Sequence, residues 1–105
     1  MSQRTTMLDT TVQGTASAGF SSRQPLATFQ AIGSVSAATG SAVVTITASN
    51  DDVNYITLGT ITLTLGTSAT SDGFAVNAPW GTFKATATTL TGTNATVKVI
   101  MGTVG

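Results

Sequence analysis

Short runs of alternating apolar and polar residues fill the chain from Leu26 to its end. In one run, Val44, Ile46 and Ala48 are apolar and threonines stand between them. A period of two residues is typical of a β-strand with one buried face. No helical period is maintained for three turns, so the pattern predicts an all-β protein. The runs expected to be strands are residues 26–32, 42–49, 54–58, 60–65, 74–76, 82–90 and 95–101.

The spacing of these runs predicts the architecture. Short strands that recur about every ten residues, with glycines between them, are typical of sandwiches and barrels. We therefore expect an antiparallel β-sandwich, of jelly-roll type, over residues 26–105. Residues 1–25 are rich in Ser, Thr, Gln and Gly and predict an extended N-terminal arm outside the core, since their apolar residues are isolated: Met7, Leu8, Val12 and Phe20.

Two glycines predict local breaks in the strands. Before Gly59 the apolar residues occupy even positions and after it they occupy odd positions, which indicates a β-bulge that keeps one face inward. Asp72-Gly73 is a dipeptide that favours tight turns, and we expect a turn there. The threonines between the apolar positions predict an outward surface that suits docking against another protein.

Asn50-Asp51-Asp52 stands between two expected strands and could be a metal loop or a hairpin tip. Alternate oxygen-bearing residues resemble the start of a calcium loop. The rest of that motif fails, because Tyr55 occupies the glycine position and Ile61 the position of the bidentate glutamate. Asn and Asp also favour tight turns, so we predict a hairpin tip and no metal.

The low charge excludes some partners. Only 8% of the residues are charged and the net charge is zero, whereas about a quarter are charged in an average protein. Nucleic-acid binding needs clustered cations, and these are scattered: Arg4, Arg23, Lys84 and Lys98. We therefore expect no nucleic-acid partner, and an uncharged surface suited to assembly with other proteins.

The residue types present also argue against catalysis. The chain has no His, Cys or Glu, and these residues supply most acid–base and nucleophilic chemistry near neutral pH. Only Lys84 and Lys98 could act as a base, each between threonines on an expected solvated face. We predict that the protein is not an enzyme and uses no cofactor.

No segment of the sequence predicts export or membrane insertion. The first 22 residues lack an apolar run of signal-peptide length, and no run approaches the ~18 apolar residues that a membrane span needs. We expect synthesis in a host cytoplasm without an N-terminal signal, and no membrane partner.

Residues 49–65 and 71–102 resemble a group of small virion proteins of tailed bacteriophages. The shared pattern falls on Ser49, Asn50, Asp51 and Tyr55, then on Leu58 to Ile61, Ser71 to Phe74 and Ala78 to Trp80. The resemblance covers about half of the chain and consists mainly of turn and strand residues. It implies a structural component of the virion, and no catalytic residue is carried over.

Together these features lead to a hypothesis of function. We expect a capsid decoration or cement protein on the capsid exterior, which bridges major capsid subunits and associates with itself as a dimer or trimer. The residues expected to make these contacts are Phe20, Leu26, Tyr55 and Trp80. Alternatives are an adaptor in the neck, tail or head fibre, and a carbohydrate-binding module in which Trp80 and Tyr55 stack on sugars. For Trp80 alone, closing one end of the core is the simpler interpretation.

Overall fold

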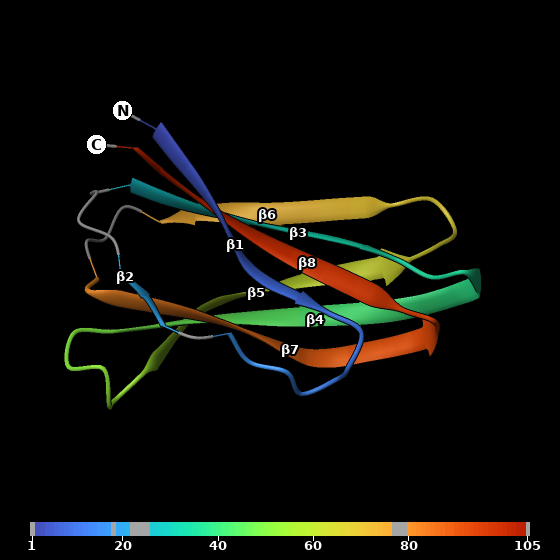
Figure 1. Ribbon diagram of the computed structural model, residues 1–105, viewed down its shortest axis with the longest axis horizontal. Coiled ribbons are helices and arrows are strands. Elements are labelled where there is room, and N and C mark those ends of the chain that lie inside the picture. The colour runs from blue at the N-terminus through green and yellow to red at the C-terminus, as the bar shows by residue number, and fades with distance from the viewer. Residues whose placement is uncertain (1, 18, 22–25, 77–79, 105) are drawn as a thin grey trace.

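The chain folds into two antiparallel β-sheets packed face to face (Figure 1). The computed structural model describes residues 2–17, 19–21, 26–76 and 80–104. One four-stranded sheet has the order β1-β8-β3-β6, and the other has the order β2-β7-β4-β5. The strands are β1 (Ser2–Thr10), β2 (Phe20–Ser21), β3 (Leu26–Ser34), β4 (Ala37–Ser49), β5 (Ile56–Leu65), β6 (Thr70–Val76), β7 (Thr82–Thr93) and β8 (Thr96–Val104). The prediction of an all-β antiparallel sandwich is confirmed.

Most strands pair with partners that are distant in sequence. Strand β8 lies between β1 and β3, and β7 lies between β2 and β4. Among the described strands, β4 and β5 are the one consecutive pair joined by backbone hydrogen bonds. Eight strands in two sheets with this order are consistent with a jelly roll.

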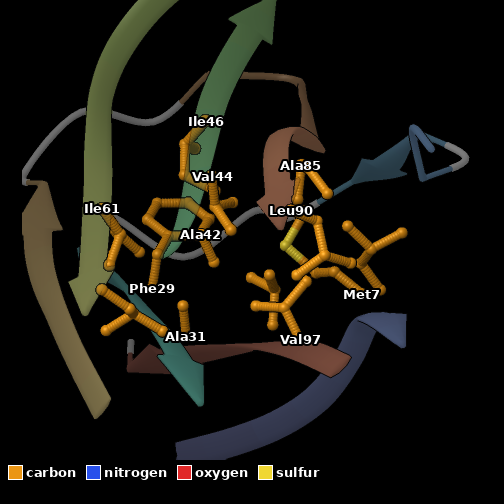
Figure 2. Close-up of a cluster of buried hydrophobic side chains, with 14 of the residues drawn as sticks. Met7, Phe29, Ala31, Ala42, Val44, Ile46, Ile61, Ala85, Leu90 and Val97 are labelled. Carbon is orange, nitrogen blue, oxygen red and sulfur yellow. The ribbon is translucent and has the colours of Figure 1, made fainter. Parts of the chain in front are cut away.

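The core lies between the two inner faces. Val44, Ile46 and Ala48 are fully buried, as the alternation in β4 predicts. Three phenylalanines cross the sandwich: the ring centroid of Phe29 in β3 lies 5.6 Å from that of Phe74 and 5.3 Å from that of Phe83. Figure 2 shows part of this apolar cluster, with side chains from both sheets pointing toward one another. Each large apolar side chain buried in this way contributes about 1.5–3 kcal/mol.

The N-terminal segment does not lie outside the core. Strand β1 pairs with β8 along its length, and its register shifts between Thr6 and Leu8. This bulge lets two consecutive residues, Met7 and Leu8, face inward, and each is only 6% exposed. Figure 2 shows Met7 pointing into the same cluster as Leu90. The expectation that residues 1–25 form an arm outside the core is therefore wrong for β1, because the bulge hides the alternation by which a strand is recognised.

The segment after β1 covers one edge of the second sheet. The backbone N–H of Gly14 donates to the carbonyl oxygen of Ala87 at 2.8 Å, and that of Ala87 donates to the carbonyl oxygen of Thr15 at 2.9 Å. Further along, the Ser17 N–H donates to the Ala85 carbonyl oxygen at 2.7 Å. Strand β2 then continues the pairing with β7. The outer edge of β7 is therefore closed by residues from the expected arm.

The two predicted breaks had different outcomes. Residues 56–65 form one strand, and the partners of Ile46 and Thr47 are Gly59 and Thr57, which leaves Leu58 as the extra residue of a bulge. The bulge predicted at Gly59 is confirmed. The turn predicted at Asp72-Gly73 is wrong, because both residues lie within β6 and Gly73 pairs with Gln30. A Cβ at Gly73 would collide with the carbonyl oxygen of Phe29, so this glycine permits close strand approach.

Candidate functional site

The Asn50-Asp51-Asp52 stretch is the tip of a hairpin, as predicted. Strand β4 ends at Ser49, β5 begins at Ile56, and the two strands pair antiparallel. Asp52 has a φ of 60°, a left-handed conformation that Asp tolerates better than most residues. Figure 1 shows this loop at the same end of the sandwich as β2.

The carboxylate of Asp51 holds the loop in shape. Its Oδ1 accepts hydrogen bonds from the backbone N–H groups of Asn54 at 2.8 Å and Val53 at 2.9 Å. Its Oδ2 accepts one from the Asn54 side-chain amide at 2.8 Å. These hydrogen bonds, the Asn54 backbone bond foremost, hold the pKa of Asp51 well below its usual range. The carboxylate therefore bonds donors of its own loop, which is the chemistry of a turn.

Ser49 has a structural role in this loop that was not predicted from the sequence. Its side chain is fully buried. Its Oγ accepts hydrogen bonds from the N–H groups of Asp51 at 3.1 Å and Asp52 at 3.0 Å, and donates one to Asp51 Oδ1 at 2.7 Å. A serine directly before Asn-Asp-Asp is a recognisable turn signal, because its hydroxyl bonds nearby backbone N–H groups.

Tyr55 joins the tip to the neighbouring strands. Its hydroxyl donates a hydrogen bond to Asp52 Oδ1, and the Lys84 ammonium of β7 lies 4.5 Å from its ring centroid. The bond to Asp52 raises the pKa of Tyr55 to about 12, since it stabilises the protonated phenol. A Cβ at Gly19 would lie 3.6 Å from the Tyr55 hydroxyl. The tip, β7 and the segment before β2 therefore meet at this ring.

Trp80 lies partly buried, two residues before β7 begins, and packs against the core. The N–H of its neighbour Gly81 donates to the Asn50 side-chain oxygen at 2.8 Å, which ties the hairpin tip to this segment. Trp80 therefore closes the core, while the Tyr55 ring contacts Lys84. This arrangement gives little support to paired stacking of both rings on a sugar.

For the other two expected contact residues, Phe20 and Leu26, the structure describes the position of the backbone. Phe20 in β2 lies opposite Phe83 of β7. Leu26 begins β3 in the other sheet, opposite Val104 of β8. Their side chains lie outside the described residues. Contact roles for Phe20, Leu26, Tyr55 and Trp80 remain a prediction.

A second candidate site is the outer face of the sheet that contains β7, β4 and β5. Thr45 of β4 lies between Thr86 of β7 and Thr60 of β5, and Val43 lies between Thr89 and Thr62. We call this surface the threonine face. Its side chains are those of Ser41, Val43, Thr45, Thr47, Thr57, Thr60, Thr62, Thr64, Thr82, Lys84, Thr86, Thr88, Thr89 and Thr91.

The threonine face differs in charge from the opposite side of the sandwich. Lys84 is its one charged residue among those named above. On the outer face of the other sheet three exposed residues are charged: Arg4, Asp9 and Lys98. Adjacent hydroxyls on the threonine face interact across strands, as Ser41 and Thr91 do at 3.1 Å. The protein therefore has one nearly uncharged hydroxyl-and-methyl face and one face of mixed charge.

The described part of the chain contains no group of three or more His, Cys, Asp or Glu side chains placed to hold a metal ion. No helix in the same residues is long and apolar enough to cross a membrane.

Comparison with known proteins identifies a shared fold. No protein-family model and no curated protein matches the chain. The crystal structure of the PBSX exported protein XepA matches with a TM-score of 0.54 and 10% identity, over 98% of this chain and 37% of XepA. A structure of Bacillus endospore appendages, described as a novel family of disulfide-linked pili, matches with a TM-score of 0.47 and 19% identity, over 100% of this chain and 88% of that chain. The chain thus spans little more than a third of XepA, and the likeness to XepA is one of β-sandwich fold alone.

Proposed function

We propose that this chain is a structural protein of a bacteriophage virion that decorates the capsid exterior and bridges major capsid subunits. The observation that carries the proposal is the threonine face. Charged residues are depleted from the centres of protein interfaces, and this face has one charge over three strands. Such a surface can be buried against another protein at a low desolvation cost.

The chemistry of threonine suits this role. A threonine on a sheet presents a methyl group, which gains from burial, and a hydroxyl, which can donate or accept a hydrogen bond. A regular shell repeats the same contact many times, so modest affinity at each site is sufficient for stable decoration. The face therefore supports a mechanical role, and the resemblance of residues 49–65 and 71–102 to small virion proteins points to the capsid.

The fold changes how bridging would be achieved. The sequence predicted an extended arm outside the core, but β1 is an integral strand and the segment after it covers β7. We therefore propose docking of a preformed rigid sandwich through its threonine face. Rigid docking avoids the entropy cost of ordering a segment at assembly.

A pair of matched variants tests this role. Thr45 lies at the centre of the threonine face, whereas Thr28 lies in a central strand of the opposite sheet. Thr45→Asp buries a charge in the proposed interface, so it is expected to fold and to lose binding to capsids that lack the protein. Thr28→Asp makes the same change on the other face and is expected to keep binding. Equal binding by both variants would exclude the threonine face as the docking surface.

Adaptor roles in the neck, tail or head fibre are the competing functions within the virion. The same face could serve them, because it specifies a protein partner and not its position. Copy number separates the roles, since a decoration protein approaches the number of capsid subunits.

A further inference from the structure

Residues 60–64 of strand β5 form a sheet edge that carries no charge, proline or bulge against pairing with another chain. Natural proteins protect edge strands with charges, proline, bulges or a covering segment. Among the described strands, β1 carries Arg4, Asp9 and a bulge, and β6 carries Asp72. The edge beyond β7 is covered by residues 14–17 and β2. Strand β5 has 10 residues, ITLGTITLTL, with no charge and no proline.

The unprotected part of β5 is self-complementary. Residues 60–64 read Thr-Ile-Thr-Leu-Thr, so the order of polar and apolar positions is the same in both directions from Thr62. The three threonines are exposed. Ile61 and Leu63 face the core and are 2% and 4% exposed. Its bulge lies at Leu58, outside this stretch.

The backbone of this stretch is directed outward. The carbonyl oxygen of Val43 in β4 accepts a hydrogen bond from Thr88 Oγ1 of β7 at 3.0 Å, so it points toward β7 and away from β5. Val43 lies opposite Thr62, and these two therefore form a non-hydrogen-bonded pair. In such a pair, the N–H and C=O of Thr62 point away from β4.

The same direction holds for the neighbouring threonines. Backbone groups alternate along a strand, so Thr60 and Thr64 point the same way as Thr62. The Thr64 carbonyl oxygen accepts a hydrogen bond from Thr70 Oγ1 of β6 at 3.2 Å, which agrees with an orientation away from β4. That oxygen retains a second lone pair. Donors and acceptors for another strand are thus in place from Thr60 to Thr64.

We infer that a second copy of this chain pairs with β5 in antiparallel register, with a two-fold axis at Thr62. In this register Thr62 lies opposite Thr62 of the second copy as a hydrogen-bonded pair, and Thr60 lies opposite Thr64 of the second copy. Two copies meet through the same surface, as a two-fold dimer requires. The pairing joins two four-stranded sheets into one continuous sheet, and the threonine face continues across the dimer.

The charge of Lys84 does not oppose this pairing. Lys84 in β7 is two strands away from β5. At about 4.8 Å between strands, the two copies of Lys84 lie five spacings, roughly 24 Å, apart across the sheet alone. They are also separated along the strands, because Lys84 lies beside Thr47, which is opposite Thr57. Their separation exceeds the screening length of about 8 Å at physiological ionic strength. The occupant that fits β5 is therefore a second copy, and the inference holds whether or not the protein decorates capsids.

Cysteine substitution tests the register in the purified chain, which has no cysteine of its own. Thr62→Cys places two thiols on Cα atoms about 5.5 Å apart across the axis, within disulfide range. Thr57→Cys places them about 34 Å apart, because each lies five residues from the axis. Under mild oxidation Thr62→Cys is expected to give mainly covalent dimer and Thr57→Cys to stay monomeric. Equal yields from both variants would overturn the inference.

Opposite charges at position 62 test the pairing of two β5 strands without a covalent bond. Thr62→Lys and Thr62→Asp are each expected to be monomeric by sedimentation, because like charges then face each other on the axis, and an equimolar mixture is expected to restore the dimer. Thr57→Lys, the matched control, is expected to keep the mass of the parent. A monomeric parent, or a Thr62→Lys variant that stays dimeric, would contradict the proposed interface. Neither experiment contains capsids, so this result is separate from that on the proposed function.

Discussion

The Ser49 hydroxyl donates a 2.7 Å hydrogen bond to the Asp51 carboxylate, and this contact lies at the centre of the β4–β5 hairpin tip. Asp51 in turn accepts from the N–H groups of Asn54 and Val53. The two side chains thus form the loop that carries Tyr55 and Asp52. Because every donor comes from the same loop, the acidic tip is explained by turn formation.

Stability at low pH should depend on Asp51. Its pKa is depressed in the folded protein and is about 3.9 in an unfolded chain. The contribution of the Asp51 carboxylate to the stability of the fold is therefore fully present above about pH 4. It is lost as the pH falls toward the pKa of Asp51 in the folded protein. Asp51→Asn should flatten the dependence of the melting temperature on pH below about pH 4. Val53→Ala, a control in the same loop that removes no titratable group and alters a side chain that is 77% exposed, should keep the slope of the parent. An unchanged slope in Asp51→Asn would contradict this assignment.

Tyr55 should ionise at unusually high pH. Asp52 raises the pKa of Tyr55 to about 12, compared with about 10 in an unfolded chain. The contribution of this hydrogen bond to stability is fully present below about pH 10. It is lost as the pH rises through the pKa of Tyr55 in the folded protein. Asp52→Asn should lower the midpoint of tyrosinate absorbance by at least one pH unit, and the signal is specific because the chain has one tyrosine. A midpoint near pH 10 in the parent would show that the hydrogen bond is not formed in solution.

Strand β1 should contribute to global stability. Leu8 is 6% exposed and Val12 is 63% exposed. Leu8→Ala should lower the free energy of unfolding by about 2–5 kcal/mol, the usual cost of such a cavity, and Val12→Ala should change it by less than about 0.5 kcal/mol. Denaturant unfolding measures both. If Leu8→Ala were as stable as the parent, the N-terminal segment would be an arm after all.

Gly73 should be intolerant of a side chain. A Cβ there would collide with the Phe29 carbonyl oxygen, whereas a Cβ at Gly66 meets nothing within 4 Å. Gly73→Ala should destabilise the fold by about 1–3 kcal/mol through overpacking, and Gly66→Ala should be close to neutral. Thermal melts of the two variants provide the comparison. Equal stability would mean that β3 and β6 do not approach as closely as described.

The sequence predicted those parts of the fold that follow from a regular period of two. Val44, Ile46 and Ala48 alternate without interruption and are buried as expected. Gly59 marked a bulge because the parity changes on either side of it. Strand β1 was missed because its bulge places the apolar residues Met7 and Leu8 next to each other, and this hides the alternation by which a strand is recognised. Asp72-Gly73 was misjudged because pairing with β3 overrides the turn preference of this dipeptide.

The candidate sites needed long-range information. Rows of outward threonines could be expected from single strands. Their union into one face also depends on β7 lying beside β4, and these two strands are far apart in sequence. The role of Ser49 depends on a buried hydroxyl whose partners are set by the loop. The outward direction of the Thr62 backbone follows from the β4–β7 pairing and cannot be read from β5 alone.

The most direct test of the central claim is the copy number and position of this chain in purified particles, measured by quantitative mass spectrometry together with an electron cryomicroscopy map. A decoration protein is expected at a number approaching that of the major capsid subunits, on the outer surface of the shell, with the threonine face toward the capsid. A low number confined to the neck or tail, or absence from the particles, would contradict the capsid role.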